Sequence, residues 1–197
     1  MMKQQFTAEL VLAAYSQAIF PMGHDDGSIR WYSPDPRCIF DLDDFHVPRR
    51  LARTRRQGKF RMTVNEAFGE VIRACAERDS TWITEDIIRV YEELHELGFA
   101  HSVEAYYRGE LAGGLYGVSL GGAFMGESMF HNVTDASKIS LVYLVERMKE
   151  RGFILLDTQY MTEHLSTFNA RYISKKDYQG RLEKALQMSC RFDDRRS

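Results

Sequence analysis

Residues 100–130 read AHSVEAYYRGELAGGLYGVSLGGAFMGESMF and contain three short runs rich in aromatic and aliphatic residues. The turn signals Arg108-Gly109 and Leu120-Gly121-Gly122 separate these runs. Strands divided by such short glycine turns usually pair with their chain neighbours as an antiparallel meander. We therefore expect three antiparallel strands that pair in chain order.

Helical patterns flank this meander on both sides. Asn65 and Thr84 are placed to cap two amphipathic helices before it, and Thr134 or Asp135 is placed to cap a long helix after it. An apolar strand and a last helix, opened by Ser174, follow in the chain. This order predicts an α+β fold whose largely antiparallel sheet, flanked by helices, becomes mixed at its fourth strand.

The N-terminal region is predicted to be a small separate domain. Thr7 is positioned to cap a first helix, and residues 31–37 (WYSPDPR) hold two prolines that keep the chain extended. We place the boundary inside this stretch, with the small domain over residues 1–34 and the main domain over residues 35–197.

The bulk composition excludes several classes of protein. Of the 197 residues, 44% are hydrophobic and 27% are charged, as in ordinary globular proteins. The first residues lack the apolar core of a signal peptide, and no segment reaches the roughly 18 apolar residues of a membrane span. The three scattered cysteines form no metal-binding or disulfide pattern. We expect a cytoplasmic protein that needs no metal and no membrane.

Charge is distributed unevenly along the chain. Residues 49–61 (RRLARTRRQGKFR) carry +7 without any acid, although the whole chain has a net charge of -2. Such a stretch fits a polyanion, and a solvated helix face is the alternative. The motif TDASK adds Lys138 at a helix N-terminus, a second place suited to phosphate. The basic residues concerned are Arg49, Arg50, Arg53, Arg55, Arg56, Lys59, Arg61 and Lys138.

The apolar strand FILLDTQ ends in two polar residues, Asp157 and Gln159. Because strand side chains alternate between two faces, both should lie on one face and Thr158 on the other. By the same alternation Glu127 should share a face with Met125 and Met129. Each polar residue alone could be a buried structural partner, but three of them on one sheet favour a cleft with an apolar lining.

Eight motifs occur in one order along nearly the whole chain. They are AIFPM, WYSPDPR, VNEAFGEVIRACA, TWIT, YEELHELGFAHSVE, GELAGGLYGVSLGGAFMGESMF, DASK and LLDTQYMTEHL. Each motif alone is weak evidence. Their order and spacing resemble those of the leucyl/phenylalanyl-tRNA–protein transferases, over about residues 14–178.

The resemblance implies a GNAT-like catalytic domain behind a small N-terminal domain. It also implies an aminoacyltransferase of the N-degron pathway, which moves Leu or Phe (or Met) from charged tRNA to proteins with N-terminal Arg or Lys and marks them for degradation. We expect a monomer without a cofactor. By resemblance, the catalytic residues are Asp157, Gln159 and Glu127, and the substrate-binding residues are Met22, Trp82, Leu115, Ser128, Met129 and Leu144. The basic stretch would then bind tRNA phosphates.

The sequence departs from the family pattern at several positions. Thr158 replaces the usual Cys, Met22 replaces a Trp, and Phe168-Asn169 replace Leu-Gly. Few residues precede AYSQAIFPM, so we expect the small domain to be trimmed. Two alternatives remain open. One is a related transferase with shifted amino-acid or acceptor specificity, and the other is a tRNA-binding module without catalysis. An acetyl-CoA acetyltransferase is disfavoured because MFHNVTDASK lacks a pyrophosphate loop.

Overall fold

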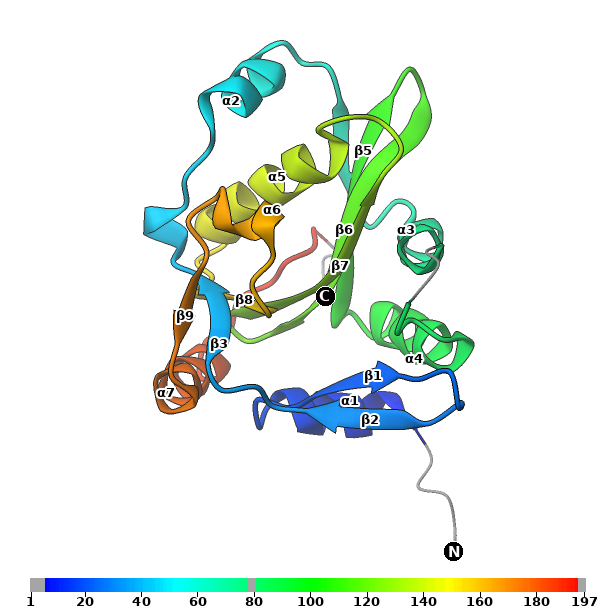
Figure 1. Cartoon of the computed structure of the whole chain (residues 1–197), viewed down its shortest axis with the longest axis vertical. Helices are drawn as coiled ribbons and strands as arrows, with labels where there is room; N and C mark the ends of the chain where they lie inside the picture. The colour runs from blue at the N-terminus through cyan, green and yellow to red at the C-terminus, as the bar shows by residue number, and fades with distance from the viewer. Residues whose placement is uncertain (1–5, 78–80, 195–197) are drawn as a thin grey trace, which may run out of the picture.

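The computed structural model describes residues 6–77 and 81–194. Within this part of the chain, seven strands form one large sheet and two more form a small one (Figure 1). In spatial order the strands of the large sheet are β4 (Arg61–Val64), β5 (Ala100–Tyr107), β6 (Glu110–Leu120), β7 (Ala123–His131), β8 (Leu155–Gln159), β3 (Arg37–Phe40) and β9 (Arg171–Ile173).

The predicted meander is confirmed as β5, β6 and β7, which pair antiparallel in chain order. The fourth strand of the prediction, β8, pairs with β7 in parallel. The helix α5 (Ala136–Glu150) makes the crossover between them. The structure therefore confirms the α+β class and a largely antiparallel sheet that becomes mixed at this strand.

The pairing between β7 and β8 is short. Ala123, Phe124 and Met125 face Leu155, Leu156 and Asp157, and no further pairs follow although β7 continues to His131. The two strands diverge beyond this point, so the sheet opens next to the end of β8.

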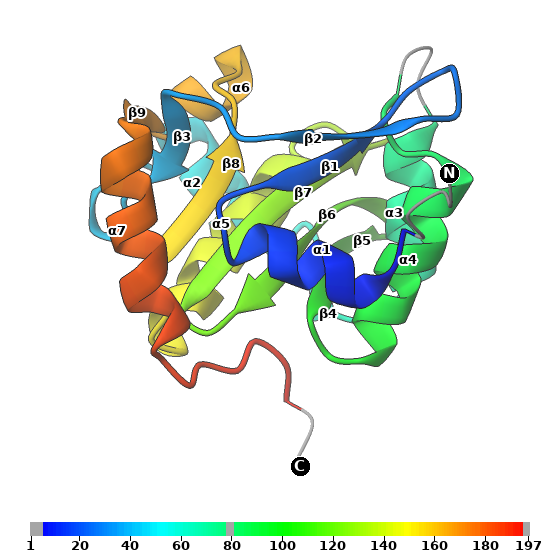
Figure 2. The same cartoon turned by 90° about the horizontal axis from the view of Figure 1, so that it is seen from below.

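Helices cover both faces of the sheet (Figures 1 and 2). One apolar cluster joins one face to α1, α3, α4 and α7, and a second joins the other face to α2, α5 and α6. The helices other than α5 are α1 (Ala8–Tyr15), α2 (Arg49–Arg56), α3 (Phe68–Ala76), α4 (Glu85–Glu96), α6 (Glu163–Ser166) and α7 (Lys175–Leu186), and a 3-10 helix, η1, spans Leu42–Asp44. Each cluster buries the apolar stripe that the sequence periodicity indicates.

Three helix caps are as predicted. The side chains of Thr7, Thr84 and Ser174 accept hydrogen bonds from backbone N–H groups in the first turns of α1, α4 and α7. A Thr or Ser at this position satisfies one of the N–H groups that a helix start leaves free. The glycine stop after α4 is also confirmed, since Gly98 has a φ of 84°.

Two predicted caps differ from the structure. Asn65 does not cap α3, which begins after Ala67. Its side chain accepts from the backbone N–H of Ser102 and bonds the ring of His101 instead. Asp135 precedes α5 but has a φ of 76° and caps no N–H group. Its carboxylate accepts from Arg50 on α2, so a tertiary ion pair replaces the local cap.

The N-terminal elements lie across the face of the sheet, between α7 and α4 (Figure 2). The strands β1 (Phe20–Gly23) and β2 (Ile29–Tyr32) form the small antiparallel sheet. Val11 and Tyr15 of α1 are buried in the same apolar cluster as α4. The domain boundary at residue 34 stays a prediction.

No helix among residues 6–77 and 81–194 is both long enough and apolar enough to cross a membrane.

The fold places the N-terminal hairpin beside the point where β7 and β8 diverge. The polar residues singled out by the sequence belong to these two strands.

Candidate active site

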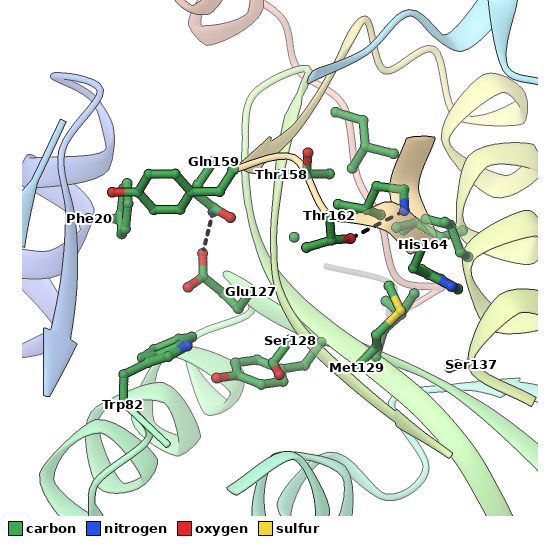
Figure 3. Close-up of a pocket in the computed structure, with 18 of the residues that line it drawn as sticks. Phe20, Trp82, Glu127, Ser128, Met129, Ser137, Thr158, Gln159, Thr162 and His164 are labelled. Carbon is green, nitrogen blue, oxygen red and sulfur yellow. Dashed lines mark hydrogen bonds between the residues drawn. The ribbon is translucent and has the colours of Figure 1, made fainter. Parts of the chain in front are cut away.

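A pocket of about 500 Å³ lies where β7 and β8 diverge. The second half of β7, the end of β8 and α6, the inner side of α5 and the N-terminal strand β1 form its walls. Its lining includes Met22, Trp82, Leu115, Glu127, Ser128, Met129, Leu144 and Gln159. The structure thus brings all the predicted substrate-binding positions together with Glu127 and Gln159. Figure 3 shows Trp82, Ser128 and Met129 beside these two residues. Asp157 does not line the pocket.

A β-bulge places Glu127. Tyr116 pairs with Ser128 and Gly117 pairs with Gly126, so Glu127 is the extra residue on β7. The prediction that Glu127 shares a face with both Met125 and Met129 is therefore wrong. These two methionines belong to the clusters on opposite faces of the sheet, because the bulge interrupts the strict alternation of a strand.

Glu127 lies in an environment that disfavours its charge. Burial is the main cause that raises its pKa to about 8, and the charge of Asp157 adds to the effect. Hydrogen bonding to Tyr15 and Tyr91 and the charge of Arg37 oppose it. The two tyrosine hydroxyls also bond each other at 2.5 Å. The Glu127 carboxyl is therefore mainly neutral at pH 7.

Gln159 leaves the strand geometry at the end of β8. Its φ is 57°, in the left-handed region that residues other than Gly, Asn and Asp seldom adopt. Its backbone N–H donates to Oδ1 of Asp157 at 2.9 Å, and its Nε2 donates to Oε1 of Glu127 at 3.2 Å (Figure 3). This leaves the carboxamide oxygen as an acceptor at the pocket.

Asp157 is fully buried and completely hydrogen-bonded. Arg37 donates from Nε to Oδ1 at 2.9 Å and from a terminal nitrogen to Oδ2 at 2.6 Å. The hydroxyl of Tyr178 donates to Oδ2 at 2.8 Å. Burial raises the pKa of Tyr178 well above its ordinary value, so the hydroxyl keeps this proton. Asp157 thus anchors the end of β8 rather than facing a ligand.

One sequence expectation about this strand is wrong. Leu156 and Thr158 line the pocket and Asp157 does not, so these residues alternate as expected and the pocket lies on the side of Thr158. Gln159 also lines the pocket instead of sharing the face of Asp157, because its left-handed backbone ends the alternation. The Thr158 hydroxyl donates to the backbone carbonyl of Cys38 at 3.3 Å. The position where family members usually carry Cys and this chain carries Thr158 is therefore part of the pocket wall.

Arg37 is the buried partner of Asp157, and sequence reasoning misses it. Its side chain is only 1% exposed, and its guanidinium lies 4.8 and 4.6 Å from the ring centres of Phe20 and Tyr178. Burial lowers its pKa, but the hydrogen bonds and charge of Asp157 raise it overall. A signal is present in the sequence, because this arginine ends the WYSPDPR motif. Its partner lies 120 positions further along the chain, a distance that local patterns do not span.

The pocket lining also includes His164. Its Nε2 is buried and has no hydrogen-bond partner among the described residues. Burial and the charges of Lys138 and His131 lower its pKa, so the imidazole is neutral at pH 7.

Within residues 6–77 and 81–194, no group of His, Cys, Asp and Glu is arranged to hold a metal ion.

The basic stretch forms α2 and the segment that leads to β4. Arg50 pairs with Asp135 at 2.6 Å, Arg55 with Glu146 at 2.6 Å and Arg61 with Glu66 at 3.2 Å. The remaining cations of the stretch are exposed and make no ion pair within the described chain; they are Arg49, Arg53, Arg56 and Lys59. Lys138 is half-buried in the first turn of α5.

Comparison with known proteins gives a consistent result. The family model described as leucyl/phenylalanyl-tRNA protein transferase matches residues 39–183, and the model of that family's N-terminal domain matches residues 4–35. The leucyl/phenylalanyl-tRNA--protein transferase of Salinibacter ruber is 52% identical over 95% of this chain and 84% of its own length. That of Gloeobacter violaceus is 54% identical over 94% of this chain and 97% of its own length. Similarity to solved structures is slight, with a TM-score of 0.42 and 14% identity to L-PGS from Bacillus licheniformis over 81% of this chain and 55% of that one.

Proposed function

The chain belongs to the leucyl/phenylalanyl-tRNA protein transferase family, and we propose that its pocket transfers Leu or Phe from a charged tRNA to the α-amine of a protein. The single observation that carries this proposal is the Gln159 carboxamide, which is fixed at the edge of an apolar pocket by Asp157 and Glu127.

The apolar part of the pocket fits the side chain of the amino acid that is transferred. Leu115 and Leu144 are buried and Met129 is partly buried against the same cluster. Such a surface holds Leu, Phe or Met and excludes charged side chains, which would lose their hydration without a partner. Trp82 and Met22 close the side nearest the N-terminal hairpin.

The reaction is the aminolysis of an ester. The neutral α-amine of the acceptor attacks the ester carbonyl carbon, a C–N bond forms, the C–O bond to the tRNA ribose breaks, and the amine proton ends on the ribose oxygen. The carboxamide oxygen of Gln159 accepts a hydrogen bond from the attacking amine and holds its lone pair toward the carbonyl. Positioning of this kind contributes several kcal/mol, about 7 or more in the best cases.

Asp157 is a positioning residue in this scheme. It holds the backbone of Gln159 through the hydrogen bond from the Gln159 N–H, and so keeps the carboxamide at the pocket. Glu127 has two roles. It fixes the carboxamide through its hydrogen bond to Nε2, and it binds the α-ammonium of the aminoacyl group. A cation that enters the pocket favours the charged carboxylate and expels its proton.

The tRNA is bound outside the pocket. Its phosphates contact the exposed, unpaired cations of α2, which are Arg49, Arg53 and Arg56, and the nearby Lys59, without any reading of sequence. Lys138 on α5 adds a further phosphate contact.

The remaining features of the proposal follow the family resemblance. They are acceptors with N-terminal Arg or Lys, a role in the N-degron pathway, a GNAT-like topology, a monomer and a cytoplasmic location.

A transfer assay tests the proposal. Purified protein is incubated with tRNA charged with each of several labelled amino acids and with peptides that begin with Arg, Lys, Asp or Gly. We expect label from Leu or Phe on the Arg and Lys peptides. Label from another amino acid, or on another peptide, would indicate the related transferase with shifted specificity. Salt-sensitive tRNA binding without any transfer would indicate a binding module and contradict the proposal.

A further inference from the structure

The tip of the β5–β6 hairpin gathers cations around one tyrosine ring. Tyr107 pairs with Glu110, and the two residues between them, Arg108 and Gly109, form the turn with φ of 55° and 89°. Lys59 places its Nζ 5.2 Å from the centre of the Tyr107 ring, and the guanidinium of Arg108 lies 5.1 Å from it. Two cations therefore lie against the same aromatic ring at the end of the hairpin.

The backbone at this turn is unusual for arginine. A two-residue hairpin turn with both φ values positive favours Asn, Asp or Gly, because other side chains are strained there. An arginine at the first position thus works against the local preference of the turn. In this conformation the exposed side chain holds its charge over the Tyr107 ring at the tip.

The cations at the tip are not neutralised by the protein. Neither Lys59 nor Arg108 makes an ion pair within residues 6–77 and 81–194, and the nearby Glu110 is exposed and bonds neither of them. The ring that carries them is held in place, since Tyr107 packs on the buried Phe60 at 6.0 Å between ring centres. Uncompensated cations on a rigid aromatic support are suited to a phosphate-rich partner.

The hairpin tip and α2 lie at the same end of the molecule (Figure 1), and Lys59, in the segment between α2 and β4, lies against Tyr107 of the hairpin. We propose that the tip of the β5–β6 hairpin, formed by Tyr107 and Arg108, extends the RNA-contact surface of α2 and Lys59 onto a second element of the fold. The proposal rests on the proposed function for the identity of the RNA, a tRNA. Arg108 and Lys59 contact the phosphate backbone, and Tyr107 keeps them apart and in place.

Binding of uncharged leucine tRNA, measured by fluorescence anisotropy between about 50 and about 200 mM salt, tests this proposal. The variants are Lys59→Gln, Arg108→Gln and the pair combined. Each lost phosphate contact lowers the slope of log affinity against log salt by about 1, so the double variant should lose about 2. Arg89→Gln, which removes an exposed guanidinium on α4, is the control and should leave the slope unchanged.

Two further variants test the role of the ring. Tyr107→Phe should bind tRNA as the wild-type protein does, whereas Tyr107→Leu should weaken binding because the cations lose their support. Thermal unfolding of each variant shows whether the fold is kept. An Arg108→Gln variant that is folded and keeps the wild-type slope overturns the proposal, even if Lys59→Gln lowers the slope. So does an effect on the KM of the acceptor peptide alone, which would assign the tip to the protein substrate. Failure of the proposed function would appear separately, as wild-type protein that does not transfer.

Discussion

The backbone N–H of Gln159 donates to Oδ1 of Asp157 across 2.9 Å and holds Gln159 in a left-handed conformation. The same carboxylate is clamped by Arg37 through two hydrogen bonds. The position of the Gln159 carboxamide therefore depends on a buried ion pair behind the strand. In the proposed mechanism, this relationship separates the group that contacts the substrate, Gln159, from the group that positions it, Asp157.

Replacement of Asp157 should destabilise the protein and also slow aminoacyl transfer. Asp157→Ala leaves the buried guanidinium of Arg37 without its partner, and the loss of one member of such a pair costs about 3–5 kcal/mol. Chemical denaturation followed by circular dichroism measures this change. The control Asp177→Ala alters an exposed acid on α7. It should cost about 1 kcal/mol at most through its cap bond.

A double replacement separates charge from shape at this site. Arg37→Met combined with Asp157→Leu removes both charges and keeps an apolar filling. We expect it to recover much of the stability lost by Asp157→Ala, because a buried ion pair adds little over well-packed apolar groups. It should remain slow in transfer, since the N–H of Gln159 has lost its acceptor. Full activity in the double variant would contradict the positioning role of Asp157.

The raised pKa of Glu127 predicts how stability depends on pH. The folded protein holds the Glu127 proton more tightly than the unfolded chain does, since the pKa rises from 4.5 to about 8 on folding. This contribution to stability is complete below pH 4.5 and is lost as the pH rises towards 8. Urea denaturation midpoints measured from about pH 5 to about pH 9 follow this loss.

Glu127→Gln supplies the comparison for this pH dependence. The variant carries no titrating group at the position, so the difference in stability between wild-type and variant should change with pH in favour of the variant as the pH rises. A difference that stays constant from about pH 5 to about pH 9 would show that the Glu127 carboxyl titrates at its ordinary pKa.

The fold can be predicted to the extent that it depends on local patterns. The meander of β5–β7 follows from short runs and glycine turns, and Thr7, Thr84 and Ser174 cap the helices that their neighbours indicate. The predicted caps Asn65 and Asp135 are wrong. Each side chain has a partner far along the chain, the Ser102 N–H and Arg50 respectively, and a tertiary bond of this kind competes with a local cap.

The candidate site is predictable as a set of residues but not as a geometry. Ordered motifs identify Glu127 and Gln159, and the structure brings them within hydrogen-bond distance. The alternation of a regular strand fails at both residues. Glu127 is the extra residue of a β-bulge, and Gln159 has a positive φ that ends the strand geometry. Sequence patterns miss Arg37, since the pairing of β3 with β8, which no local pattern predicts, is what brings it to Asp157.

The exposed arginines of α2 should dominate tRNA affinity. Arg53→Gln removes a cation that has no acidic partner in the described chain, so we expect weaker tRNA binding and a salt slope that is smaller by about 1. Arg30→Gln, in the hairpin β1–β2, removes an arginine that pairs with Asp26 and serves as the control. Equal effects of the two changes would argue against a tRNA surface on α2.

The width of the pocket should set the choice between Leu and Phe. Met129→Ala removes a flexible side chain from the wall and should favour Phe over Leu by roughly 10-fold in kcat/KM, the lower end of the effect of one methylene group in an apolar pocket. Competition between the two charged tRNAs in one reaction measures the ratio directly. A ratio unchanged from that of the wild-type protein would place the side chain of the donor amino acid elsewhere.

Single-turnover transfer of labelled Leu from its tRNA to a peptide with N-terminal Arg, compared between wild-type protein and Gln159→Ala, tests the central claim most directly. The control variant is Gln179→Ala, which changes an exposed glutamine on α7. We predict that the wild-type protein and the control transfer at the same rate, and that Gln159→Ala is slower by about 100-fold with unchanged tRNA affinity, as expected for a lost positioning contact. Transfer by Gln159→Ala at the wild-type rate would contradict the account.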